Sequence, residues 1–191
     1  MKIQHSRTEH LAEYARHLKN LKDEDRYTRF GCAVSDAAID ALILSMLYHP
    51  DQHHLFTYYA DKHIVGFGHL AREDSDWELA VSVDHDYQGR GIANKLMEHM
   101  IAWGKTHGVH SVFMHCIRDN QRIQHLARKH GLKTMERTEH EITAQVKLPK
   151  PTVLDYAANF INEQRMIAQG IAKLQGSWLK NWVAPKHDHS N

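Results

Sequence analysis

The sequence predicts a mixed α/β domain followed by a C-terminal helical extension. Segments that alternate apolar and polar residues, as half-buried strands do, are interleaved with segments whose apolar residues recur at helical spacing. After Pro151 the pattern changes to a long helical stripe without further strand signals. With 191 residues, of which 42% are hydrophobic, the chain can bury the core of one α/β domain and carry an appendage, but it is short for two full domains.

The N-terminal part predicts one strand and two helices. Residues 2–5 are expected to form a strand, and residues 8–21 a helix whose apolar side chains lie on one side. The charged segment 22–34 is expected to be a loop. Ser35 is a typical N-cap residue and predicts the start of a second helix, which runs through Met46.

Strands account for most of the remaining domain. Residues 54–59 and 64–71 lie on either side of the turn Ala60-Asp-Lys62, and both are expected to be strands from the family resemblance given below. Residues 111–117 predict another strand, and residues 133–148 alternate well enough for two more. These segments would build one sheet.

The segment 77–101 is the most informative part of the chain. It begins as an alternating strand, and beyond Gly91 its apolar residues recur at helical spacing, so the helix begins at the glycine-containing turn. One face of the strand carries Trp77, Leu79, Val81 and Val83, and the other carries Glu78, Ala80 and Ser82.

The turn Gly89-Arg90-Gly91 has the properties of an anion-binding site. The start of a helix offers roughly half a positive charge and several unpaired N–H groups, and glycines let a phosphate approach the backbone. Arg90 adds a full charge. The turn lacks the Gly-Lys-Ser/Thr ending of a P-loop and the third glycine of a dinucleotide-binding motif.

Gln88-x-x-Gly91-x-Ala93, directly after a strand, resembles the Gln/Arg-x-x-Gly-x-Gly/Ala signature of the GNAT N-acetyltransferase superfamily, in its bacterial type. The resemblance extends over residues 1–148. It implies a mixed, mostly antiparallel sheet with a splayed pair of central strands, flanked by helices, with residues 149–191 as the C-terminal helical extension. The flanking segments that agree with it are Ile64-Val-Gly-Phe-Gly-His-Leu-Ala71 and Asp119-Asn-Gln-Arg-Ile-Gln-His-Leu-Ala-Arg-Lys-His-Gly-Leu132.

By this resemblance the protein binds acetyl-CoA or another short-chain acyl-CoA as acyl donor, without a metal. The backbone of Val81 and Val83 would pair with the pantetheine arm in the gap between the strands 78–83 and 112–117. Asn120 would contact the pantetheine through its amide. The residues that would face the pyrophosphate are Gly89, Arg90, Gly91, Ile92 and Ala93, and Gln88, which begins the same turn, would also belong to the cofactor-binding site.

Glu78 occupies the strand position where many relatives carry the carboxylate that deprotonates the amine. Partial desolvation would raise the pKa of such a carboxyl toward a useful range. Alternatively, Glu78 forms a cross-strand pair with a basic neighbour. The family's usual acid, a tyrosine, is replaced by Ala127. Ser82, His130 or a water could take its place, or the thiolate could leave without an acid.

Two alternatives to direct acyl transfer remain, whereas a metal site is not expected. Cys116 could carry the acyl group covalently, although a single thiol on a strand without an obvious base is more often a core residue. The loss of the tyrosine also fits a catalytically silent acyl-CoA-binding regulatory protein. The many histidines form no His-Glu-x-x-His motif and no quartet with cysteines, and they predict surface or half-buried side chains rather than a metal site.

Composition excludes several partners. A formal net charge of +1 gives no reason to expect nucleic-acid or membrane binding. Two cysteines do not make a disulfide scaffold, and the longest apolar run is far shorter than the ~20 residues that cross a bilayer. These features, together with a start that lacks an apolar signal region, predict a cytoplasmic protein.

The acceptor is expected to be a primary amine of a small molecule or a protein. The Asp-Arg-Tyr-x-Arg-Phe segment at 25–30 resembles one bacterial subset of the superfamily, in which it borders the acceptor pocket. Alternatively, Tyr27 and Phe30 plug the core while Arg26 pairs with acids. Because the loops 22–34 and 133–140 carry both charges, no particular acceptor is selected.

The extension carries an apolar stripe from Val153 to Trp178 with alternating steps of four and three residues, the spacing of a heptad seam. The helix 153–178 would join two chains in a homodimer or fold back on its own domain.

Overall fold

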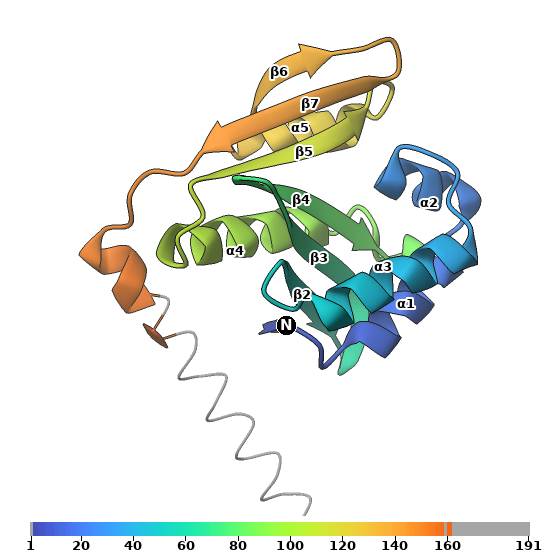
Figure 1. Ribbon diagram of the computed structural model, residues 1–191, viewed down its shortest axis with the longest axis horizontal. Coiled ribbons are helices and arrows are strands. Elements are labelled where there is room, and N and C mark those ends of the chain that lie inside the picture. The colour runs from blue at the N-terminus through green and yellow to red at the C-terminus, as the bar shows by residue number, and fades with distance from the viewer. Residues whose placement is uncertain (1, 159, 162–191) are drawn as a thin grey trace, which may run out of the picture. The chain divides into compact units, whose positions relative to one another are not determined.

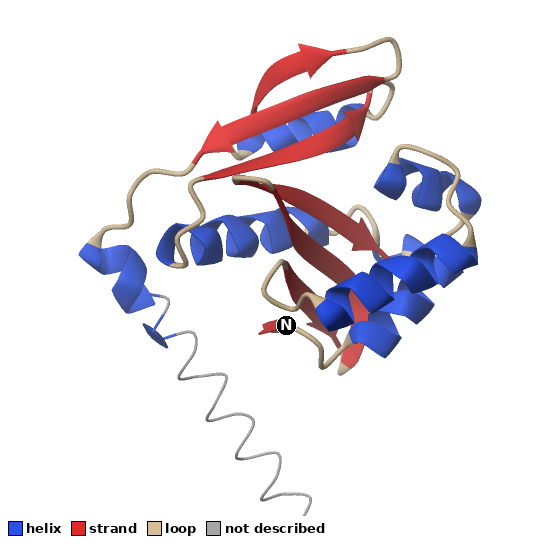
Figure 2. Ribbon diagram, viewed as in Figure 1, coloured by secondary structure: helices blue, strands red, loops and turns tan. Residues whose placement is uncertain are grey.

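The computed structural model describes residues 2–158, 160 and 161, and the chain divides into two compact units after Pro151. The first unit is a seven-stranded sheet with helices on both faces (Figures 1 and 2). The strands are β1 (Lys2–Ser6), β2 (His53–Ala60), β3 (His63–Glu73), β4 (Asp76–Val83), β5 (Ser111–Ile117), β6 (Lys133–Arg137) and β7 (Glu141–Lys147). They lie in the order β1-β2-β3-β4-β5-β7-β6, and every neighbouring pair except β4–β5 is antiparallel. The predicted mixed, mostly antiparallel sheet is confirmed.

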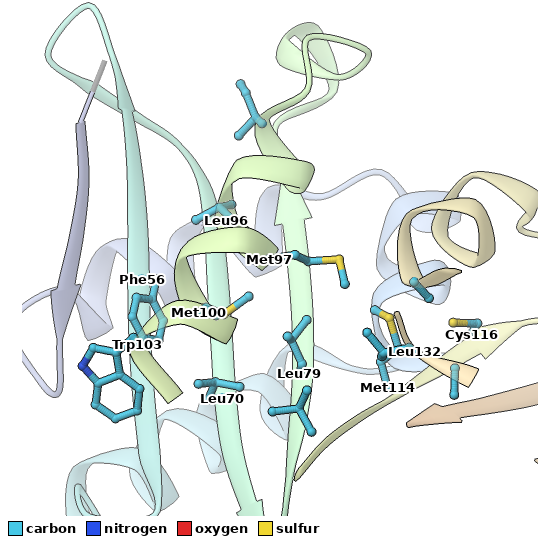
Figure 3. Packing of buried hydrophobic residues seen from close by; sticks show 14 of the residues in the cluster. Phe56, Leu70, Leu79, Leu96, Met97, Met100, Trp103, Met114, Cys116 and Leu132 are labelled. Carbon is cyan, nitrogen blue, oxygen red and sulfur yellow. The ribbon is translucent and has the colours of Figure 1, made fainter. Parts of the chain in front are cut away.

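The helices pack on the sheet through two clusters of buried side chains. The helices of the first unit are α1 (Leu11–Asn20), α2 (Asp23–Phe30), α3 (Asp36–Tyr48), α4 (Ile92–Thr106), α5 (Gln121–Lys129) and the short 3-10 helix η1 (His85–Tyr87). Phe56 packs in the cluster with α4, whereas its neighbour Leu55 packs in the cluster with α1 and α3, because successive strand residues point to opposite faces. Figure 3 shows the side chains of α4 lying over Phe56, Leu70 and Leu79. No helix in the described part of the chain is apolar over enough residues to span a bilayer.

The two central strands separate soon after they meet. Trp77 lies opposite Val112 and Glu78 opposite Phe113, and these are the last residues at which β4 and β5 are paired. Beyond them the strands diverge (Figure 1), while β4 stays paired with β3 and β5 with β7. The predicted splay is therefore confirmed.

The segment predicted as a charged loop contains a helix, α2, so the expectation of a loop is wrong there. Acidic residues fill its first turn, where they favour a helix, and Gly31 ends it in the left-handed conformation. A helix with no fully buried side chain needs no apolar stripe, so α2 could not be predicted from the spacing of apolar residues. Arg26 does pair with an acid, Asp36 (2.9 Å), and Phe30 packs on the core, but Tyr27 is 46% exposed and plugs nothing.

The second unit begins where the sequence predicts a helix. Residues 153–158 are helical, as are 160 and 161. Thr152 and Asp155 bond reciprocally at its start: the Thr152 N–H donates to the Asp155 carboxylate (2.8 Å), and the Asp155 N–H donates to the Thr152 hydroxyl (3.3 Å). The remainder of the predicted 153–178 helix, with most of its stripe, lies outside the described residues.

Candidate active site

A cavity of about 320 Å³ occupies the gap that opens between β4 and β5. We call it the splay cavity. Its walls come from four parts of the first unit: residues 78–81 of β4, residues 114–117 of β5, residues 28–31 at the end of α2, and His69 and Ala71 of β3, with Leu42, Ile123 and Glu141 completing the lining. The divergence of the strands therefore creates a site that α2 borders.

The free edge of β4 turns its backbone toward this gap. The Asp84 N–H donates to the Val65 carbonyl of β3 at 2.9 Å. In an antiparallel pair the backbone groups of alternate residues point toward the partner strand, so Ser82 shares the direction of Asp84. Val81 and Val83 consequently point their backbone groups away from β3, toward the gap. This is the geometry that backbone pairing with an extended ligand requires.

The glycine turn leaves space and donors at the start of α4. Gly89 and Gly91 both have left-handed backbones, with φ of 73° and 74°, and a Cβ added at either would meet nothing within 4 Å. No side chain caps α4, whereas Ser35 caps α3. The first N–H groups of α4, which begins at Ile92, are thus left for an anion.

Gln88 uses its donors inside the protein. Its side-chain amide donates to Asp25 of α2 at 2.9 Å and lies 3.4 Å from the Val83 carbonyl oxygen, and its backbone N–H donates to the His85 carbonyl at 3.2 Å. Gln88 thereby ties the turn to α2.

Arg90 is also directed at its own loop. Its guanidinium donates to the Asp86 carbonyl at 2.8 Å and lies over the Tyr87 ring, 4.9 Å from the ring centre. Its charge remains beside the turn, but the side chain would have to rotate to contact a phosphate directly.

Glu78 lines the splay cavity with a carboxylate that has no partner among the described residues. Its cross-strand neighbours are Ala71 and Phe113, neither of which is charged. No described residue forms a hydrogen bond or ion pair with this half-buried carboxylate. The alternative of a cross-strand ion pair therefore does not hold within the described chain.

Arg29, which the sequence did not single out, enters the same cavity from α2. Its guanidinium donates to the Tyr14 hydroxyl at 3.1 Å and lies 3.5 Å from His69 Nδ1. Burial, and then the charge of Arg29, holds the pKa of His69 well below its ordinary value. His69 is therefore neutral and can accept from Arg29. The motif at 25–30 contained Arg29, but its partners lie 15 and 40 residues away in the sequence.

The fold and the glycine turn match a known family. The sequence model of the acetyltransferase (GNAT) family matches residues 9–132, which is more than half of the chain. The chain belongs to the GNAT acetyltransferase family. A search of curated proteins gave no match.

Solved GNAT acetyltransferases share the fold. Spermidine N-acetyltransferase from Vibrio cholerae, in complex with CoA and spermine, is 15% identical, with 77% of this chain and 95% of that chain covered and a TM-score of 0.63. PaiA N-acetyltransferase from Thermoplasma acidophilum, in complex with coenzyme A, is 17% identical over 77% of this chain and 99% of that one, with a TM-score of 0.58. The GNAT domain of S. lividans PAT is 16% identical, with 76% of this chain and 89% of that chain covered and a TM-score of 0.63.

Two positions expected from the GNAT resemblance belong to α5, one as its N-cap and one within the helix. The Asn120 side-chain oxygen accepts the Ile123 N–H at 3.1 Å and caps the helix, which leaves the NH₂ group of its amide for a ligand. Ala127, at the tyrosine position, is buried in the core and has no proton to donate. His130 lies at the end of α5, where its Nε2 is 3.2 Å from the Asn94 side-chain oxygen, and it does not line the splay cavity.

Ser82 belongs to a buried network that sequence reasoning missed. Its hydroxyl lies 2.9 Å from His17 Nε2, and His17 Nδ1 lies 2.8 Å from the Asp84 carboxylate. His17 comes from α1, 65 residues before Ser82, so no local pattern announces the contact. Ser82 is not among the residues that line the splay cavity.

Cys116 does line the splay cavity, but its environment suits a core residue. Its side chain is 2% exposed, and burial raises the pKa of the Cys116 thiol to about 11. Because the thiolate is the nucleophilic form, a thiol with this pKa is a poor acyl carrier at neutral pH.

The histidines gather in pairs. His5 Nε2 lies 3.2 Å from His54 Nδ1, and His53 Nδ1 lies 3.1 Å from His69 Nε2. The expectation of surface or half-buried histidines is wrong for His17, His53, His54 and His69, which are buried. Other polar groups bond their ring nitrogens: Ser82 and Asp84 for His17, and another histidine for each of the other three. Within the described residues no three His, Cys, Asp or Glu side chains are placed to hold a metal ion.

Proposed function

We propose that the protein is an N-acyltransferase that moves an acetyl or other short acyl group from acyl-CoA to a primary amine, by direct attack in a ternary complex. The observation that carries the proposal is the Glu78 carboxylate, which has no bonding partner among the described residues. It lines the same cavity as the part of β4 that is no longer paired with β5. Membership in the GNAT acetyltransferase family supports it, as does the CoA named in two of the structural neighbours.

The residues of the gap and turn fit acyl-CoA. The backbone of Val81 and Val83 would hold the pantetheine arm, and the side-chain amide of Asn120 would contact the same arm. The backbone amides of residues 89–93 would bind the pyrophosphate. The open space over the left-handed glycines accommodates the phosphates without a clash. When bound, acyl-CoA would supply the thioester carbon that the amine attacks.

Glu78 would then act as the general base. It takes a proton from the ammonium group of the acceptor, directly or through one water, and the neutral amine can attack. The carbon–nitrogen bond forms as the carbon–sulfur bond breaks, and the nitrogen loses a second proton to become a neutral amide. We propose that a water carries this second proton to the departing thiolate, because position 127 is alanine and Ser82 is bound to His17 outside the cavity.

The direct test measures acetyl transfer from acetyl-CoA to a broad set of amines and detects the N-acetylated product by mass. Thermal stabilisation by CoA in the same preparation shows whether the donor site is intact. Transfer to any primary amine supports the proposal. Stabilisation by CoA without transfer to any amine would instead favour a catalytically silent acyl-CoA-binding protein, the function that the missing tyrosine suggests.

A further inference from the structure

Three charged side chains line the splay cavity without neutralising one another. Arg29 reaches it from α2, Glu78 from β4 and Glu141 from β7. Neither carboxylate lies within ion-pair distance of Arg29 or of any other described cation. Partly buried charges in a folded protein are usually paired, so a site that keeps one cation and two anions apart is arranged for a ligand that carries both signs.

Arg29 is held in place by neutral groups. Its NH2 donates to the Tyr14 hydroxyl (3.1 Å) and faces His69 Nδ1 (3.5 Å), while its Nε is shielded from solvent and has no partner. His69 Nε2 then donates to His53 Nδ1 (3.1 Å), which fixes the orientation of both rings. The side chain is therefore oriented, but its positive charge is not cancelled.

We propose that the acceptor is an amine that also carries a carboxylate, as amino acids do, and that Arg29 binds the carboxylate while Glu78 takes the proton from the amine. The inference rests on the proposed acyl transfer and names the substrate class of that site. A guanidinium bonds a carboxylate through two parallel N–H groups, which orients the acceptor as well as holding it. A volume of about 320 Å³ suits a small molecule of this kind.

Glu141 gives the cavity a second place for an ammonium group. Its Oε1 lies against the backbone of Gly31, 2.5 Å from where a Cβ would stand. An acceptor with two amines and one carboxylate could use both acids. A polyamine, which has no anion, would leave the Arg29 charge unpaired and is expected to be a poor acceptor.

The test compares L-amino acids with their carboxamides, acetyl-CoA being the donor for the full chain. The carboxamides carry more unprotonated amine at neutral pH, so a preference for the free acid runs against intrinsic reactivity. Binding of the same compounds is measured by calorimetry in the presence of CoA, which reports on the carboxylate site even if no transfer occurs. Spermidine serves as the amine without an anion.

Variants assign the preference to Arg29. Arg29→Gln should lower kcat/KM or affinity for the preferred amino acid by about ten- to hundredfold and leave its carboxamide almost unchanged. Arg29→Lys should recover part of the preference because it restores the charge. Arg16→Gln, on the exposed side of α1, is the control for loss of a positive charge.

Transfer or binding that favours the free acid and depends on Arg29 supports the inference. Carboxylate-selective binding without transfer to any amine supports it too, while the proposed acyl transfer fails. Efficient acetylation of spermidine or of carboxamides, without preference for the acids, overturns the inference and leaves acyl transfer standing. Absence of both binding and transfer for every carboxylated amine also overturns it.

Discussion

The Glu78 carboxylate has no hydrogen-bond or ion-pair partner among the described residues, which leaves it available to a ligand. Its strand neighbours across both edges are Ala71 and Phe113, so the sheet offers it neither a cation nor a donor. The side chain is half-buried and faces the splay cavity, where a bound amine would be its nearest partner. The position on the strand is set by the local sequence, but its lack of a partner is a property of the assembled sheet.

Glu78→Gln should lower kcat by roughly 10²-fold or more while affinity for acetyl-CoA changes little, because glutamine keeps the shape but cannot take a proton. The acidic limb of the pH–rate profile should also disappear. Steady-state kinetics from pH 5.5 to 9 check both, with Glu73→Gln, an exposed carboxylate of β3, as the matched control. Turnover near that of the wild type with an unaltered pH–rate profile would show that water or another residue, and not Glu78, removes the proton from the amine.

The contact between the half-buried His5 and the buried His54 should make the stability of the protein sensitive to acid. Burial lowers the pKa of His5 to about 4 and that of His54 to about 3, with smaller contributions from neighbouring positive charges. Both rings are therefore neutral in the folded protein near pH 5, whereas in the unfolded chain they bind protons below about 6.5. The unfolded state binds more protons in this window, so acid favours unfolding.

The free energy of unfolding should thus fall as the pH decreases from about 6.5 toward 4, by up to ~1.4 kcal/mol per pH unit for each of these histidines. Urea denaturation at pH 7.5 and pH 5 measures the change. His54→Gln should flatten the pH dependence, and the same substitution at the exposed His63 should not. Equal pH dependences in the two variants would contradict the assignment.

At the scale of elements, the strand β4, the glycine turn and α4 form one unit. Beyond Glu78 the backbone N–H and C=O groups on one edge of β4 are not paired with β5. The turn that follows leads into α4, whose first N–H groups have no side-chain cap. Because Gly89 and Gly91 have positive φ and open space above them, they combine a sharp turn with room for a large anion. Asp25 of α2 braces this turn through Gln88, so α2 contacts the turn at one end and the splay cavity at the other.

A ligand at 100 times its dissociation constant stabilises the folded protein by about 2.7 kcal/mol. Gly91→Asp should abolish this stabilisation by acetyl-CoA, measured as a shift in melting temperature. The added carboxylate would stand where the phosphates are expected. Gly91→Asn, which has the same shape without the charge and also tolerates positive φ, separates charge from bulk.

Gly108 offers the backbone control for this experiment. It has φ of 75° and open space for a Cβ, as Gly91 does, but it follows the other end of α4. Gly108→Asp should carry a similar conformational cost and keep the full stabilisation by acetyl-CoA. Equal stabilisation of the Gly91→Asp and Gly108→Asp proteins would place the donor elsewhere.

At the scale of the whole molecule, the C-terminal stripe predicted from the sequence is expected to need a partner surface. Its described members Val153 and Phe160 are 85% and 63% exposed. The stripe predicted from the sequence continues through Ile167 and Ile171. Burying each such side chain is worth ~1.5–3 kcal/mol, so a helix with this stripe favours association.

If the stripe joins two chains, Ile167→Asp with Ile171→Asp should convert a dimer into a monomer in light scattering. If it docks on its own domain, the double variant should leave the mass unchanged and lower the midpoint of urea denaturation. Gln169→Asp with Ala172→Asp adds the same charge off the stripe and is the control. Unchanged mass and stability would show that the stripe is not buried.

The sequence by itself determined the strands, most of the helices and the glycine turn. Periods of two and 3.6 residues are properties of single segments, and so are the caps, as Ser35 at the start of α3 illustrates. The order of these segments together with Gln88-x-x-Gly91-x-Ala93 identified the family and the splayed sheet, and placed Glu78 on the correct strand.

Only the tertiary structure decided which charges meet a partner and which do not. Arg29 with His69, Ser82 with His17 and Asp25 with Gln88 join residues 40 to 65 positions apart. Hydrogen bonding and ion pairing depend on distances of a few ångströms in space, which local periodicity does not encode. For the same reason α2 was missed: its helical state follows from its charges and its C-terminal glycine, and no apolar stripe marks it.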